Sequence, residues 1–187
     1  YEDNPTYEDR GRANTSWETS LRSADETPEA LLSCVDAFRT ETSLLSLIVI
    51  RGDELLLEEY FIGGRVDGSH NVHSASKGML GALIGIAIDE GLIEGIDQPI
   101  IELLPEATDW ERDSRLSSLT VFHLLNMTAG FMWTEDETEY EIIEEELDWV
   151  GAILGLPLVA APGEQFEYCT GATHLLSALL NEVTSSG

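Results

Sequence analysis

The chain has 187 residues, of which 43% are hydrophobic, and its 36 acidic side chains outnumber 9 basic ones to give a formal charge of −27. This excess argues against nucleic acid and anionic membranes as partners, because phosphate binding needs clustered Lys and Arg and the eight arginines are scattered. The apolar content suffices for the core of one domain, and no apolar run reaches the roughly 18 residues of a membrane span.

The first 27 residues are polar and acidic and show no hydrophobic period. We therefore expect an extended N-terminal arm over 1–27, followed by a folded domain over 28–187. Pro28 is suited to the first position of a helix, where its missing N–H costs nothing. The helix predicted after it carries apolar residues on one face, namely Leu31, Leu32, Val35 and Phe38.

Two segments rich in β-favouring residues, Leu44–Ile50 and Leu55–Phe61, flank a short polar stretch. Gly52 within that stretch supplies the conformation of a tight turn, so the pattern predicts a β-hairpin. The triplet Arg51-Gly52-Asp53 also matches an adhesion motif, but a turn between strands explains it.

Helices dominate the rest of the chain. The segment Ser74–Glu90 is helical in pattern and apolar nearly all round, which favours a place at the centre of the fold. Three further helices are predicted: Val121–Met127, capped by Thr120; the acidic Glu135–Trp149, whose charges we interpret as a solvated face; and Ala172–Val183.

The charge imbalance has three interpretations. A solvated acidic surface that maintains solubility is the simplest of them. The near absence of Lys together with abundant Asp and Glu also resembles proteins of salt-loving organisms, in which bulk salt screens the repulsion between carboxylates. The third interpretation is a mimic of nucleic acid.

The only lysine, Lys77, lies three residues after Ser74. Residues three apart on a helix face the same side, so the hydroxyl and the amine can meet in one pocket. A serine nucleophile needs a base and donors for the developing oxyanion, and a helix N-terminus offers unpaired N–H groups. Lys77 can take the proton where apolar surroundings keep it neutral, although the acidic field opposes this. The alternative is an ordinary capping serine.

Other candidate residues are weaker when taken alone. Tyr168 by itself reads as a half-buried aromatic at the end of a strand, and Trp133 either lines a cleft or packs in the core. His73 adjoins Ser74, but adjacent residues rarely point together. His123 and His174 lie in apolar helical runs without metal-ligand spacing, so we expect no metal and no cofactor.

The two cysteines, Cys34 and Cys169, are too few for a disulfide framework. We expect them to be buried free thiols, although one bridge between them is the alternative.

Several segments together resemble the serine β-lactamase and penicillin-binding-protein superfamily, in particular its class C-like branch of esterases, carboxypeptidases and amide hydrolases. The resemblance implies an α/β plus all-α fold of the β-lactamase-like (transpeptidase-like) type, of which this chain contains the N-terminal hairpin of the sheet and the helical region. The segments that carry it are the hairpin, Ser74-Ala75-Ser76-Lys77, Gly85–Gly91, Leu119–Gly130 and Pro162–Thr170.

Carried over by position, the resemblance implies Ser74 as the acyl-accepting nucleophile, Lys77 as its proton partner and Tyr168 as general base or acid. The family usually has Tyr-x-Asn at the second motif, whereas this chain reads Tyr168-Cys169-Thr170. Thr170 offers a hydroxyl in place of the amide for binding substrate, and Trp133 is the second candidate substrate-binding residue.

The implied function is hydrolysis of an ester or small amide through an acyl-enzyme on Ser74. A D-amino-acid peptide or a β-lactam is the alternative substrate, and the Thr at position 170 argues against a true β-lactamase. A non-catalytic binding relative or an inactive fragment is the alternative of another class.

The family's third motif, Lys-Thr-Gly or His-x-Gly, follows well after the second, and the sequence ends at Gly187 before one appears. We therefore expect the N-terminal portion of a larger enzyme, with three further strands and a final helix beyond it. The resemblance favours an extracytoplasmic location and leaves the oligomeric state open.

Overall fold

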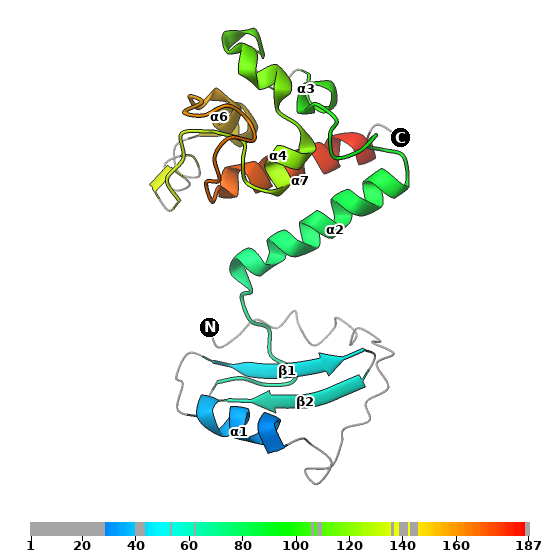
Figure 1. Ribbon diagram of the computed structural model, residues 1–187, viewed down its shortest axis with the longest axis vertical. Helices are drawn as coiled ribbons and strands as arrows, with labels where there is room; N and C mark the ends of the chain where they lie inside the picture. Colours follow the sequence, from blue (N-terminus) through cyan, green and yellow to red (C-terminus); the bar gives the residue numbers. More distant parts are fainter. Residues whose placement is uncertain are drawn as a thin grey trace. The chain divides into compact units, whose positions relative to one another are not determined.

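The computed structural model describes residues 29–185, with the exception of 40–43, 53, 62, 106, 108–109, 136, 139–141 and 143–145. The arm predicted for 1–27 lies outside these residues. The contacts within the chain divide it into two units, which meet in sequence at Asn71 and Val72 (Figure 1).

The first unit contains the predicted hairpin. Strands β1 (Ser46–Arg51) and β2 (Glu54–Tyr60) pair antiparallel, and Gly52 between them has a φ of +61°, which glycine adopts without strain. Helix α1 (Glu29–Phe38) begins directly after Pro28 and buries Val35. Hairpin and helix therefore form as their sequence patterns predict.

The second unit is helical, and α7 (Thr170–Ser185) is its central element. This helix contacts α2 (Ser76–Asp89), α3 (Ile100–Leu103), α4 (Val121–Leu125) and α6 (Trp149–Gly155) (Figure 1). It begins two residues before the predicted start. Its core face consists of Gly171, Ala172, Leu175, Leu176 and Leu179, all buried.

Helix α2 is less buried than its composition predicts. Ile84 and Ala87 belong to the same core as the leucines of α7. Met79, Leu83 and Ile86 are instead 66%, 51% and 50% exposed. Burial is thus limited to the side of α2 that meets this core. Because α2 is apolar nearly all round, its other side leaves apolar residues exposed at the surface.

The acidic helix predicted over Glu135–Trp149 is only partly present. Residues 137, 138 and 142 are helical, but Glu135 lies in a turn. A separate helix, α6, begins at Trp149, because the Asp148 side chain accepts a hydrogen bond from the Gly151 N–H at 2.9 Å and caps it. The prediction of one continuous helix is therefore wrong at both ends.

The two cysteines are free thiols in different settings. Cys169 is buried as expected, whereas Cys34 is exposed on α1, so the prediction of burial is wrong for Cys34. No helix within the described part of the chain combines the length and apolarity needed to cross a bilayer.

Candidate active site

The Ser74 hydroxyl and the Lys77 amine are hydrogen-bonded, with Nζ 2.9 Å from Oγ. Ser74 lies in a 3₁₀ turn, His73–Ala75, that leads directly into α2, and Lys77 lies in the first turn of α2. Ser74 is exposed and Lys77 half-buried. The three-residue spacing therefore brings the two groups together as predicted, although Ser74 precedes the α-helix instead of opening it.

The backbone just before Ser74 has an unusual conformation. His73 has a φ of +43°, a region that non-glycine residues seldom adopt. The Ser76 hydroxyl donates a hydrogen bond to the His73 carbonyl at 2.7 Å, which helps to hold the turn. This turn fixes Ser74 at the head of α2, within reach of Lys77.

Tyr168 lies beside the pair. The Lys77 Nζ atom is 5.3 Å from the centre of the Tyr168 ring, within the range of a cation–π contact. Tyr168 belongs to the segment that enters α7. Backbone hydrogen bonds tie this segment to the loop after α4, from Gly163 N–H to Thr128 at 2.8 Å and from Glu167 N–H to Met127 at 2.9 Å. The structure thus brings Ser74, Lys77 and Tyr168 together.

The loop that follows α4 depends on a glycine. Gly130 has a φ of +84°, and a Cβ there would overlap the Ala160 carbonyl oxygen and lie 3.1 Å from its carbon. The Gly130 carbonyl accepts a hydrogen bond from Val159 N–H at 2.9 Å. Residues 130–133 are in this way fixed against residues 158–160.

Glu135 joins the two residues that the sequence assigned to substrate binding. Its carboxylate accepts hydrogen bonds from the Trp133 indole N–H at 2.6 Å, from the Thr170 backbone N–H at 3.0 Å and from the Thr170 hydroxyl. The indole packs on Gly171, where a Cβ would lie 2.7 Å from the ring. Trp133 is therefore buried and oriented by this cluster.

The surroundings of Glu135 keep it charged. Partial burial alone would raise its pKa, but the hydrogen bonds from Thr170 and Trp133 and the charge of Lys77 lower the pKa below its usual value. Glu135 is thus an anion that lies close to Lys77 and is shared by the start of α7 and the loop that carries Trp133.

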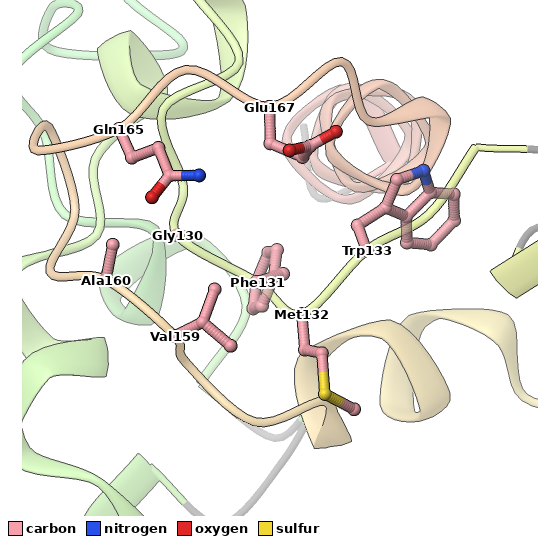
Figure 2. Close-up of a pocket in the computed structure, with 8 residues that line it drawn as sticks. All are labelled: Gly130, Phe131, Met132, Trp133, Val159, Ala160, Gln165 and Glu167. Atoms are coloured by element: carbon pink, nitrogen blue, oxygen red, sulfur yellow. The ribbon is translucent and has the colours of Figure 1, made fainter.

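A cavity of about 100 Å³ lies next to this cluster. Figure 2 shows that residues 130–133 line one part of it, and that Val159, Ala160, Gln165 and Glu167 complete the lining. Trp133 thus contributes to a cavity as well as to the Glu135 cluster. Neither Ser74 nor Lys77 lines it, so its use by substrate stays a prediction.

The remaining candidates serve the fold. His123 forms a capping box with Thr120 at the start of α4, and burial lowers its pKa. His174 packs edge to face on Trp149, and burial lowers its pKa as well. Burial raises the pKa of Cys169 to about 12, which leaves almost no thiolate near neutral pH. Within the described residues, no three His, Cys, Asp or Glu side chains are grouped to hold a metal ion.

Sequence reasoning missed Glu135. It lies in a run of acidic residues, and such runs are usually solvated. One local signal was available, because Glu135 comes two residues after a tryptophan in a loop that follows a glycine.

Comparison with known proteins places these features in a family. The model of the beta-lactamase family matches residues 33–187. A 6-aminohexanoate-dimer hydrolase of Paenarthrobacter ureafaciens is 29% identical over 166 residues, which are 81% of this chain and 39% of that protein. The chain therefore spans well under half the length of this curated relative.

Two solved structures share the fold. A protein of Bacillus anthracis assigned as a 6-aminohexanoate-dimer hydrolase aligns with a TM-score of 0.62 and 17% identity, over 83% of this chain and 43% of its own. A protein of Bacteroides dorei assigned as a β-lactamase aligns with a TM-score of 0.60 and 21% identity, over 83% of this chain and 46% of its own. The predicted α/β plus all-α, β-lactamase-like fold class is confirmed.

Proposed function

Because the chain belongs to the beta-lactamase family, we propose that the protein is a serine hydrolase that forms an acyl-enzyme on Ser74 and cleaves an ester or a small amide. The observation that carries this proposal is the 2.9 Å hydrogen bond between Lys77 Nζ and Ser74 Oγ. A serine hydroxyl becomes an effective nucleophile when a neighbouring group accepts its proton.

In the proposed reaction, Ser74 Oγ attacks the carbonyl carbon of the substrate and its proton passes to the Lys77 and Tyr168 pair. The tetrahedral intermediate then collapses, the same pair returns the proton to the leaving oxygen or nitrogen, and an ester to Ser74 remains. Water attacks that ester with the roles of the proton carriers reversed, and the acid product leaves. Lys77 is suited to this task because its Nζ lies 2.9 Å from Ser74 Oγ, and Tyr168 is the proposed second carrier because its ring lies beside that amine, with the ring centre 5.3 Å from Nζ.

A small amide is the substrate class best supported. The curated relative is named for the hydrolysis of a 6-aminohexanoate dimer, and such a dimer is joined by an amide bond. Ser74 would attack the carbonyl carbon of an ester in the same way, and the alcohol of an ester is a better leaving group than an amine. A D-amino-acid peptide or a β-lactam is the alternative, and Thr170 in place of the family's usual Asn argues against a β-lactam.

Active-site labelling tests the proposal. A fluorophosphonate should modify the full-length protein on Ser74, identified by peptide mass spectrometry, and Ser74→Ala should abolish the labelling. Ser117→Ala is the matched control, because Ser117 is an exposed serine whose hydroxyl bonds to a backbone carbonyl away from Lys77. Equal labelling of Ser74→Ala and the wild type would refute the assignment.

A further inference from the structure

The Thr170 hydroxyl can act toward a substrate in only one way in this structure. It has a single proton and two lone pairs. An ionised carboxylate is an acceptor only, so the hydrogen bond between Thr170 Oγ1 and Glu135 Oε1 uses the hydroxyl proton. The oxygen of Thr170 is left with lone pairs for any further partner.

The other contacts of Glu135 hold this arrangement in one orientation. The Trp133 indole and the Thr170 backbone N–H are donors without acceptor capacity, and both bond to Oε2. Oε1 therefore remains for the hydroxyl. With three donors on one partly buried carboxylate, neither oxygen is free to exchange partners without loss of a hydrogen bond.

We propose that Glu135 is a positioning residue that fixes the Thr170 hydroxyl as a hydrogen-bond acceptor. The site then favours substrates that present an N–H group to Thr170, and therefore favours amides over esters. The inference rests on the proposed function and adds to it a basis for choosing between its two substrate classes. Thr170 lies two residues after Tyr168, whose ring centre is 5.3 Å from Lys77 Nζ, so this cluster adjoins the segment that carries one of the proposed proton carriers.

The substitution Glu135→Gln tests the orientation directly. The two N–H donors at Oε2 require an acceptor, so the glutamine oxygen should take that place and its NH₂ group the place of Oε1. The amide then donates to Thr170, and the hydroxyl must accept and turn its proton away. The variant keeps the shape of the side chain while it converts Thr170 from an acceptor into a donor.

The measurement is the ratio of kcat/KM for p-nitroacetanilide to that for p-nitrophenyl acetate in the full-length protein. Glu135→Gln should lower this ratio about ten-fold, the effect of one hydrogen bond. Thr170→Val should lower it similarly, Thr170→Ser should preserve it, and Glu135→Gln should add nothing in the Thr170→Val background. Glu137→Gln removes the same charge from an exposed position in the same acidic run and should leave the ratio unchanged.

Labelling of Ser74 in the wild type distinguishes failure of the inference about Glu135 from failure of the proposed function. Wild-type protein that is labelled at Ser74, with an unchanged ratio in Glu135→Gln, overturns the inference alone. Wild-type protein that is not labelled overturns the proposed function and the inference with it. Where Glu135→Gln does not fold by circular dichroism, the pair Thr170→Val and Thr170→Ser decides, and equal ratios for those two variants overturn the inference.

Discussion

Replacing Gly130 with alanine should destabilise the helical unit, because this glycine occupies a conformation and a space that no other residue fits. At a φ of +84°, an added Cβ costs about 1–2 kcal/mol through backbone strain alone. The same Cβ overlaps the Ala160 carbonyl, so the two segments must separate. That movement weakens the Val159 to Gly130 hydrogen bond, which is worth about 0.5–1.5 kcal/mol.

Gly85→Ala provides the matched comparison. Gly85 lies on α2 in the same unit, and a Cβ there meets nothing within 4 Å. Alanine should stabilise that position by about 0.5–1 kcal/mol. Both substitutions reduce the entropy of the unfolded chain equally, so this contribution cancels in the difference between them.

The two variants should therefore differ in their free energy of unfolding by about 1.5–3.5 kcal/mol, the sum of the strain and hydrogen-bond contributions. Urea unfolding followed by far-ultraviolet circular dichroism measures this difference. A difference below about 0.5 kcal/mol, the error of such comparisons, would show that the loop does not depend on close approach at Gly130.

Three further predictions concern the site. Lys77→Met should lower kcat about 10²–10⁴-fold through loss of the proton acceptor, with little change in the urea midpoint; activity within two-fold of the wild type would remove Lys77 from the mechanism. Folding lowers the pKa of Glu135, so its charged carboxylate should stabilise the protein fully above the ordinary carboxyl pKa of about 4.3. That stabilisation should be lost as the pH falls through the lowered pKa. Thermal melts should show this pH dependence in the wild type and in Glu137→Gln, but not in Glu135→Gln. Cys34 should react with Ellman's reagent in the native state and Cys169 only after unfolding, because Cys169 is buried and has a pKa of about 12; rapid reaction of both thiols would contradict this.

The sequence predicted best the elements that depend on local patterns. The hairpin follows from two β-favouring runs and Gly52, and α4 from the cap at Thr120, because these signals act over a few neighbouring residues. The contact between Ser74 and Lys77 also follows from their three-residue spacing along the chain. Each of these features needs no knowledge of distant parts of the chain.

Features that depend on contacts between residues far apart in the chain could not be predicted from the sequence. Glu135 lies in a run of residues of the same acidic type, and its role comes from Thr170, 35 residues further along the chain. The limited burial of α2 is a similar case, because composition measures how apolar a helix is but not how many of its sides meet other elements. The break at Asp148 was missed because the same residue type serves equally as a surface charge and as a helix cap.

The hydrogen bond from the Trp133 indole to Glu135 makes Trp133 a fluorescent probe of the site. The indole lies on Gly171 and lines the cavity, and it donates to a carboxylate that is close to Lys77. The emission of an indole responds to charge and polarity in its immediate surroundings. Occupation of the cavity, or acylation of Ser74 with a change in the Lys77 charge, should therefore be readable as a change in tryptophan fluorescence without a chromogenic substrate.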